Sequence, residues 1–216
     1  MADSAATQVY KRLRRMILTG EIPAEQQLIE TALAAQLKVS RTPIREALSL
    51  LKRDRLVIPV QTGGVITRDV VSELKDLLGV RKALETYAVK QAIDLITPGQ
   101  VAELEYLCNE SAIWTSEDVE PRAQHNSEFH QLLVAAARNQ RLYQTWHECR
   151  TYFLIAQESY ADQFEQFFDQ HREILEAVKA KDKATAERLV NEHLDQSFAA
   201  FIDARATSRR PDFMKS

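Results

Sequence analysis

Apolar side chains recur at helical spacing over the first third of the chain, with short polar breaks between the runs. Residues 7–19 carry an apolar stripe, and Gly20 follows as a typical helix stop. Leu33 and Leu37 close a second, shorter apolar face, and a third face begins at Ile44 after a polar break. Two short amphipathic helices joined by a tight turn are typical of a helix-turn-helix, so we predict one here.

The second helix of this pair is predicted over residues 41–54. Ser40 or Thr42 can cap its N-terminus, and Pro43 falls in the first turn, where a missing N–H costs little. In a helix-turn-helix the first residues of the second helix meet base edges, and Arg can grip guanine or a phosphate through two bonds. We therefore expect sequence-specific DNA binding. The candidate contacts are Thr31, Ser40, Arg41, Thr42 and Arg45.

A β-hairpin is predicted directly after this helix pair. Residues 56–67 consist of two runs rich in β-branched side chains, separated by Gly63 and Gly64. Such a hairpin would form the wing of a winged helix-turn-helix, and the glycines would let its tip approach a groove or a phosphate. An ordinary hairpin that only covers the core of the domain is the alternative. The candidate wing contacts are Gln61, Thr62, Gly63 and Gly64.

From residue 71 onward the pattern is purely helical. Short polar breaks separate the predicted helices, and short connections favour antiparallel neighbours in a bundle. The helices are expected over residues 72–96, 98–115, 119–138, 140–160, 163–181 and 183–206. The predicted fold is mainly α: an N-terminal winged helix-turn-helix over residues 1–70, an all-α antiparallel six-helix bundle over residues 71–206 and a disordered tail over residues 207–216.

Charge divides the chain at the same place. Residues 1–70 contain 11 Lys and Arg against 7 Asp and Glu, whereas residues 71–216 contain 17 against 24. A basic N-terminal part joined to an acidic remainder suits a DNA-binding domain attached to a domain with another role.

The cellular compartment is indicated by three features that the sequence lacks: a disulfide framework, a signal peptide and a membrane-spanning run. Cys108 and Cys149 are too few for a disulfide framework, which favours a reducing environment. The N-terminus lacks the apolar core of a signal peptide, and no apolar run is long enough to cross a membrane. We therefore expect a cytoplasmic protein that does not associate with membranes.

Histidines in the helical part form a candidate metal site. Asn126 and His130 are four residues apart and share one face of a predicted helix, while His171 and His193 lie on two later helices. Imidazoles from several helices are the usual ligands of a metal inside a bundle, and three of them with one oxygen suit Zn²⁺, Ni²⁺, Mn²⁺ or Fe²⁺. The spacing alone, taken for each histidine separately, favours a histidine that is satisfied within the core.

The run from residue 37 to residue 48, LKVSRTPIREAL, resembles the signature of the GntR family of bacterial transcriptional regulators, which usually reads LGVSRTPVREAL. Lys38 replaces the usual glycine, so the turn must accept a side chain there or a local left-handed strain. Residues 20–28 resemble the GxxxPGxxL loop of the family, with Ala24 where glycine is common. The resemblance implies a DNA-binding regulator that is not an enzyme.

Three segments of the helical part resemble the FCD (FadR C-terminal domain) subclass of that family, in its six-helix, VanR-like type. They read NSEFHQLL, HREILEAV and AERLVNEHL, where the subclass has approximately DxxFHxxL, HxxIxxAI and AxxxMxxHL. Together with the N-terminal motifs, the resemblance covers residues 8–205. It implies a divalent metal held by residues corresponding to Asn126, His130, His171 and His193.

Asn126 stands where the subclass most often has Asp. Asn offers a neutral carbonyl oxygen, so a bound ion would lose one compensating charge and some affinity. The more positive site would favour an anionic ligand. A site of histidines alone, which binds an effector directly, is the alternative.

Arg81 and Glu85 match the RxxLE motif of the subclass. A buried Arg that faces a cavity would bind the carboxylate of an effector through two bonds. The equal alternative is that Arg81 pairs with Glu85 one turn on, or with a partner subunit. Arg150 is a second candidate for effector binding.

Together these features predict a ligand-responsive regulator, with repression as the usual outcome in the family. Two chains would associate through helices near the N-terminal end of the predicted helical bundle and present two recognition helices to a pseudo-palindromic operator. A small organic acid would favour a dimer geometry that no longer matches the operator. The alternatives are a metal-free regulator that responds to a ligand and a metalloenzyme in which the histidines activate water.

Overall fold

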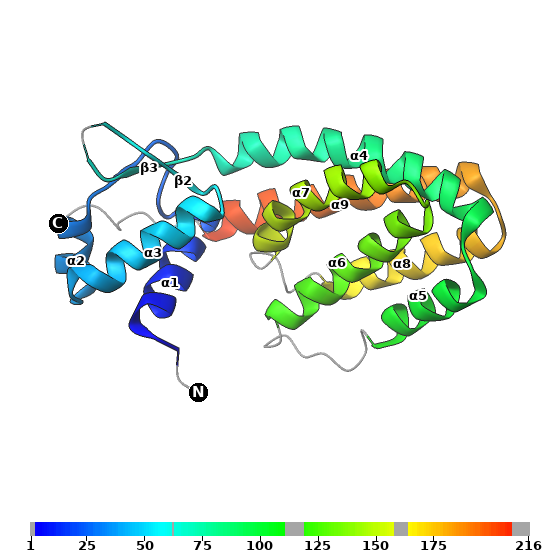
Figure 1. The fold of residues 1–216 in the computed structure, drawn as a ribbon, viewed down its shortest axis with the longest axis horizontal. Coiled ribbons are helices and arrows are strands. Elements are labelled where there is room, and N and C mark those ends of the chain that lie inside the picture. The colour runs from blue at the N-terminus through cyan, green and yellow to red at the C-terminus, as the bar shows by residue number, and fades with distance from the viewer. Residues whose placement is uncertain (1–2, 62, 111–118, 158–163, 209–216) are drawn as a thin grey trace. The chain divides into compact units, whose positions relative to one another are not determined.

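The computed structural model describes residues 3–61, 63–110, 119–157 and 164–208 (Figure 1). The chain divides into two compact units. One, here called the head, contains the residues up to Glu73 together with the segment from Ile202 onward. The other, here called the body, is Leu74–Phe201. Within the described ranges, every helix is too short or too polar to span a lipid bilayer.

The head is a winged helix-turn-helix, as predicted. Its strands form one antiparallel sheet in the order β1-β3-β2. Strands β2 and β3 make the predicted hairpin, whereas two residues are too few for the sequence pattern to indicate β1. The elements are α1 (Ala5–Thr19), β1 (Gln27–Leu28), α2 (Glu30–Leu37), α3 (Arg41–Arg53), β2 (Val57–Pro59) and β3 (Val65–Thr67).

The turn between α2 and α3 accepts a side chain at its left-handed position. Lys38 has φ 55° and ψ 43°, so the strain expected where the family has glycine is present. Ser40 occupies the N-cap position of α3, but its side chain makes no capping hydrogen bond, and Thr42 lies inside the first turn. The prediction of a side-chain cap on α3 is therefore wrong, while Pro43 does fall in that first turn.

Helix α1 packs against α3, and polar contacts hold it near its middle and at its C-terminal end. The Tyr10 hydroxyl donates to Asp54 at the end of α3, and burial together with this carboxylate raises the pKa of Tyr10 to about 12. At the C-terminal end of α1, Arg205 donates to the carbonyl of Ile17 at 2.7 Å, which also accepts from the N–H of the C-cap residue Gly20. The last turns of the chain's final helix thus belong to the head.

The body contains the six predicted helices. They are α4 (Val70–Leu95), α5 (Pro98–Glu110), α6 (Val119–Ala136), α7 (Gln140–Gln157), α8 (Phe164–Lys179) and α9 (Lys183–Ser208). Helix α9 runs two residues into the predicted tail, so residues 207 and 208 are helical, and the rest of that tail lies outside the described residues.

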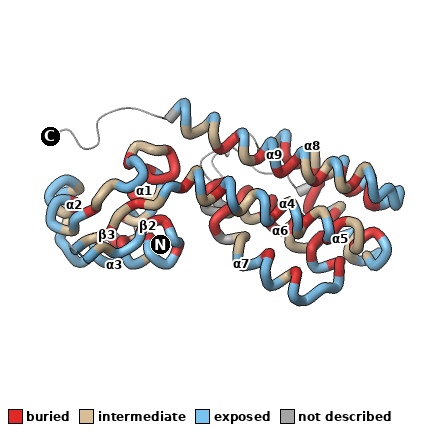
Figure 2. Tube along the Cα trace, turned by 90° about the horizontal axis from the view of Figure 1, so that it is seen from above, coloured by how far each residue is buried: buried red, intermediate tan, exposed pale blue. Residues whose placement is uncertain are grey.

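Buried positions recur along each body helix on the side that faces its neighbours (Figure 2). They form one apolar cluster contributed by α4, α5, α6, α8 and α9, in which Leu104, Phe129, Ile174 and Val190 are no more than 1% exposed. A smaller cluster surrounds Trp146 of α7. These two clusters fix the rotation of the helices about their axes, and that rotation decides which polar side chains point inward.

Candidate metal centre and DNA-binding surface

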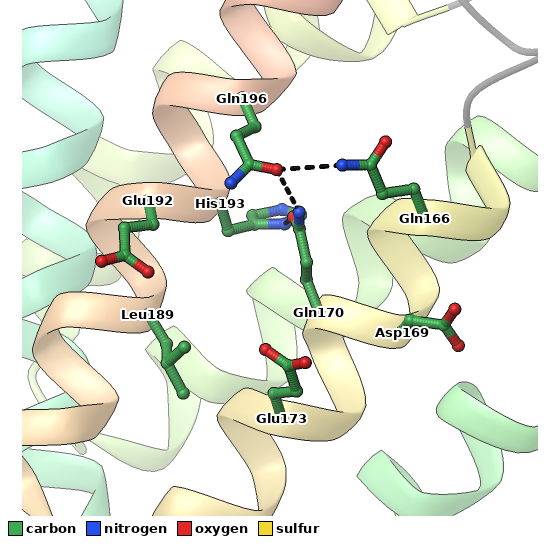
Figure 3. Close-up of a pocket in the computed structure, with 8 residues that line it drawn as sticks. All are labelled: Gln166, Asp169, Gln170, Glu173, Leu189, Glu192, His193 and Gln196. Carbon is green, nitrogen blue, oxygen red and sulfur yellow. Dashed lines mark hydrogen bonds between the residues drawn. The ribbon is translucent and has the colours of Figure 1, made fainter.

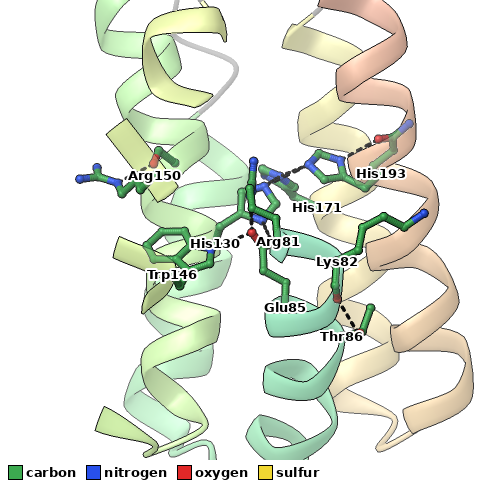
Figure 4. Close-up of polar contacts among 11 residues, drawn as sticks. Arg81, Lys82, Glu85, Thr86, His130, Trp146, Arg150, His171 and His193 are labelled. Carbon is green, nitrogen blue, oxygen red and sulfur yellow. Dashed lines mark hydrogen bonds and ion pairs between the residues drawn. The ribbon is translucent and has the colours of Figure 1, made fainter. Parts of the chain in front are cut away.

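Three histidines from different helices meet in the interior of the body. His130 lies on α6, His171 on α8 and His193 on α9, and each is 1% exposed (Figure 4). Their Nε2 atoms are close together: 3.0 Å separates His130 from His193, 3.2 Å separates His130 from His171, and 3.3 Å separates His171 from His193. The fold therefore gathers side chains that are up to 63 residues apart in sequence.

Two of these imidazoles are held through their outer nitrogen. His130 Nδ1 lies 2.8 Å from Glu85 Oε2, and His193 Nδ1 lies 2.8 Å from Gln170 Oε1, which stands beside it in Figure 3. A carboxylate and an amide oxygen can only accept hydrogen bonds, so both Nδ1 atoms carry the hydrogen and both Nε2 atoms present lone pairs. Lone pairs that face each other at 3.0 Å repel unless a cation lies between them.

The spacing of the three nitrogens matches a metal site. Metal–nitrogen bonds of about 2.0–2.1 Å place two imidazole nitrogens about 3.4 Å apart around a tetrahedral ion and about 3.0 Å apart at neighbouring octahedral positions. The observed separations of 3.0 to 3.3 Å are of this size. Burial, together with the neighbouring histidines, lowers the pKa of His171 and of His193 well below the usual value, which favours the neutral form that binds metals.

Asn126 supplies an oxygen that the rest of the described chain does not use. It precedes His130 by one turn of α6 and is 1% exposed, and its Oδ1 has no hydrogen-bond partner among the described residues. Buried polar atoms without a partner are rare, and those that occur call for a ligand, an ion or water. Three imidazole nitrogens together with an unpaired amide oxygen one helical turn from His130 suit a divalent ion, so the residues present fit the metal that the sequence predicts.

Glu85 is the residue that orients His130. Besides accepting from His130, its carboxylate accepts from Arg81 Nε at 2.6 Å and from Trp146 Nε1 at 2.7 Å. Burial alone would raise the pKa of Glu85, but the charge of Arg81, together with the hydrogen bonds from His130 and Arg81, holds it well below the usual range. An ionised carboxylate that fixes the tautomer of a histidine is a common support of metal ligands. The sequence placed Glu85 in a motif but gave no sign of this role.

The two arginines proposed for effector binding differ in their surroundings. Arg81 pairs with Glu85 one turn on, which is the alternative stated above for it. Arg150 donates to Ser127 Oγ at 2.6 Å and to Gln124 Oε1 at 3.1 Å, and both of these partners are neutral. Arg81 is therefore compensated by a carboxylate within the body, whereas in the described part of the chain Arg150 is not.

Both arginines line a small interior cavity next to His130. Its volume is about 10 Å³, and Trp146, Phe153 and Gln157 form other parts of its wall. A separate groove of about 310 Å³ lies on the surface between α8 and α9 and reaches the edge of His193 (Figure 3). Polar side chains dominate the groove, so a solvent-exposed path ends at one of the three histidines.

The candidate DNA contacts of the helix-turn-helix are all exposed on the head. Thr31, Ser40 and Thr42 are exposed, and the side chains of Arg41 and Arg45 are 59% and 68% exposed. Glu30, at the start of α2, accepts from both guanidinium groups, at 3.4 Å from Arg41 and at 3.2 and 3.3 Å from Arg45. The sequence did not indicate this ion pair, because Glu30 precedes the turn by a whole helix.

The wing tip carries the expected glycines. Gly63 and Gly64 have φ of 90° and 80°, and a Cβ on Gly64 would lie 2.5 Å from the Leu28 carbonyl, so the tip needs glycine there for space as well as conformation. Gln61 is exposed, and Gln27 donates to the Gly63 carbonyl at 2.9 Å. Thr62 lies outside the described residues.

Comparison with known proteins assigns each of the two units to a known domain family. Residues 5–66 match the model of bacterial regulatory proteins of the gntR family, and residues 76–196 match the FCD domain. The chain is 31% identical over 198 residues to the HTH-type regulator YdhC of Bacillus subtilis, with 87% of each chain covered. It is 24% identical to the gluconate operon transcriptional repressor of the same organism, over 89% of this chain and 83% of the repressor.

A solved structure supports the fold. The protein Lar, described as controlling the agr system of Listeria monocytogenes, aligns with a TM-score of 0.69 and 17% identity, over 94% of this chain and 99% of Lar. A basic winged head, a helical body with a buried histidine cluster and family matches to both units lead to one conclusion. The chain belongs to the GntR family of bacterial regulatory proteins and carries an FCD domain.

Proposed function

We propose that this chain is a cytoplasmic transcriptional repressor whose binding to an operator is modulated by a small organic acid in a metal-containing body. The observation that carries the proposal is the buried cluster in which two imidazoles, fixed by Glu85 and Gln170, turn their Nε2 lone pairs toward one another. Repression is the role named for the gluconate operon relative, which spans most of this chain.

His130, His171, His193 and Asn126 would hold the divalent ion, with Zn²⁺, Ni²⁺, Mn²⁺ and Fe²⁺ as the suitable metals. When bound, the ion supplies a concentrated positive charge and a coordination position for an anion. None of these four ligands is a carboxylate, so the protein itself would leave the charge of the ion largely uncompensated. A small carboxylate is the ligand class that such a centre favours.

Arg150 is the residue best placed to strengthen the preference for a small carboxylate. It lines the cavity beside His130, and its partners there are neutral. Arg81 lines the same cavity but is already paired with Glu85, so its main role is to position the carboxylate that orients His130. The carboxylate of an effector would therefore bind to Arg150 first.

A homodimer is the assembly that suits the head, because paired recognition helices read the two halves of a pseudo-palindrome. Val80 and Tyr87 of α4 are 42% and 47% exposed and stand seven residues apart, on one face of that helix. This apolar face lies near the N-terminal end of the body, where the contact between two copies is expected. An acid would act by favouring one dimer geometry over another.

Two other functions make different predictions. A metal-free regulator would bind its effector with no ion present, and a metalloenzyme would turn over a substrate when loaded with metal. The family match favours regulation over catalysis, and the unused oxygen of Asn126 favours a metal over histidines alone. Elemental content separates the first alternative from our proposal, and a turnover screen with loaded protein separates the second.

The DNA-binding part of the proposal is tested by selecting duplexes from a random library with the intact protein. We expect enrichment of a pseudo-palindrome whose half-sites are about one helical turn, 10 base pairs, or a multiple of it apart. Selection of a single, non-repeated site would contradict the dimer, and no enrichment at all would contradict sequence-specific binding.

The ion pairs of Glu30 give a sharper prediction about how the head discriminates between operator and random DNA. With Glu30→Gln, Arg41 and Arg45 lose the carboxylate that holds them, so affinity for random DNA should rise several-fold while the ratio of operator to random affinity falls. Anisotropy titrations at fixed salt measure both quantities. The control is Glu46→Gln, which removes an exposed carboxylate from α3 itself. Equal effects of the two substitutions would mean that only net charge matters.

A further inference from the structure

The surface groove between α8 and α9 ends at one of the three histidines, and its lining carries negative charge. In the described part of the chain, the charged side chains of the lining are all carboxylates, from Asp169, Glu173 and Glu192. Three glutamines, Leu189 and His193 complete the lining (Figure 3). Such a groove attracts cations and repels anions, so it suits a metal ion rather than an organic acid.

Glu173 gives the groove a charge that its neighbours in the described chain do not neutralise. Asp169 forms a salt bridge with Arg172, and Glu192 forms one with Arg188 at 2.8 Å. Glu173 is exposed on α8, and within the described ranges it forms no salt bridge. Because its charge is uncompensated, its carboxylate supplies the largest part of the attraction for an incoming cation.

The groove is large enough for a hydrated ion. Its volume is about 310 Å³, and one water molecule in the liquid occupies about 30 Å³, so the groove holds roughly ten waters. A divalent ion that arrives with a first shell of about six waters therefore fits. His130, His171 and His193, by contrast, are each 1% exposed. An ion can reach their nitrogens only by shedding water and only if one of the three side chains moves.

His193 is held less firmly than His130, and it is the one that faces the groove. Its Nδ1 donates to Gln170 Oε1 at 2.8 Å, and Gln170 in turn donates to Gln196, an exposed side chain of the same groove. His130 is held instead by the ionised carboxylate of Glu85. Hydrogen bonds to a charged group are about twice as strong as those between neutral groups. The imidazole of His193 should therefore swing into the groove before that of His130 moves.

We infer that this groove is the route by which a divalent ion reaches and leaves the buried histidines. Glu173 draws the ion in, and the hydrogen bond between Gln170 and His193 closes the inner end of the route. The inference rests on the metal of the proposed function, and it concerns how fast the ion exchanges rather than where it binds. A route sets the rates of association and dissociation together, whereas a ligand sets the dissociation constant.

The test follows the binding of Zn²⁺ to the intact, metal-stripped protein by stopped flow, with a fluorescent zinc chelator reporting free Zn²⁺. At low salt, Glu173→Gln should lower the association rate constant about three- to tenfold, and Glu173→Lys should lower it further. Both differences should shrink to less than about twofold in 1 M salt, where the Debye length is about 3 Å. The control is Glu103→Gln, which removes an exposed carboxylate of α5 outside the groove and should leave the rate unchanged.

A second variant, Leu189→Trp, narrows the groove without changing its charge. It should slow association and dissociation by the same factor, because a raised barrier acts equally in both directions, and the dissociation constant should stay within about twofold of the unmodified value. Dissociation is measured by mixing the loaded protein with excess chelator. His171→Ala, which removes a proposed ligand, shows whether the signal comes from the histidine cluster.

The outcomes separate the route from the metal site. Association as fast in both Glu173 variants as in the unmodified protein at low salt would overturn the route and leave the metal site intact. A weaker affinity in Leu189→Trp without slower association would overturn it as well. Absence of Zn²⁺ binding by the unmodified protein would contradict the metal of the proposed function and the route together. Because Glu173 is exposed, its replacement requires no repacking of the core, so the first comparison holds even if Leu189→Trp fails to fold.

Discussion

Replacing His171 with alanine should abolish the binding of a divalent ion by the body. Three imidazole nitrogens within 3.3 Å of one another form the site, and the loss of one leaves two nitrogens and the Asn126 oxygen. In the unmodified protein, metal at about a thousandfold excess over its dissociation constant should stabilise the fold by about 4 kcal/mol. Elemental analysis and thermal unfolding with and without added metal measure the two effects.

The control for this substitution is His147→Ala, which removes an exposed histidine of α7. The comparison must use the shift caused by metal rather than the absolute melting temperature, because His171 also stacks on Phe129 with 4.0 Å between ring centroids. Losing that packing destabilises the fold whether or not a metal binds. Equal metal content in His171→Ala and in the unmodified protein would defeat the proposed ligand set.

Replacing Arg45 with alanine should weaken operator binding by about 1–3 kcal/mol and relax specificity at one base position, if this guanidinium reads a base edge. Arg45 is exposed near the start of α3, where recognition helices contact bases, and Glu30 already holds its guanidinium. Anisotropy titrations with the selected operator and with single-base variants of it measure both effects.

Arg188→Ala is the matched control, because it removes an exposed arginine from the body that pairs only with Glu192 in the described residues. Its effect on operator affinity should be negligible. An unchanged affinity in Arg45→Ala would remove that residue from the interface, and a loss that is equal for all sequences would make it a phosphate contact instead.

The fold was predictable from sequence where local pattern decides it. The helix-turn-helix follows from apolar spacing and from Pro43 in the first turn of α3. The wing follows from β-branched runs around Gly63 and Gly64. Local pattern does not predict β1, because its two residues form a strand only by pairing with β3. The side-chain cap expected at Ser40 is likewise absent, because a favourable residue type does not guarantee the bond.

The candidate site was predictable only as a set of ligands. Spacing could place His130, His171 and His193 on three helices, but it could not supply the rotation of those helices. The supports of the ligands depend on that rotation: Glu85 reaches His130 from α4, and Gln170 reaches His193 from α8. For the same reason, the sequence could not decide whether Arg81 binds an effector or pairs with Glu85 or a partner subunit.

The central claim is that a ligand in the body changes how the head binds DNA. It is tested most directly by the affinity of the intact protein for its selected operator and for random DNA, at one moderate salt concentration, with and without a saturating small acid. We expect a clear preference for the operator and a change of about 5- to 150-fold in operator affinity when the acid is added. Equal affinity for operator and random DNA, or an operator affinity that no acid alters, would contradict the account.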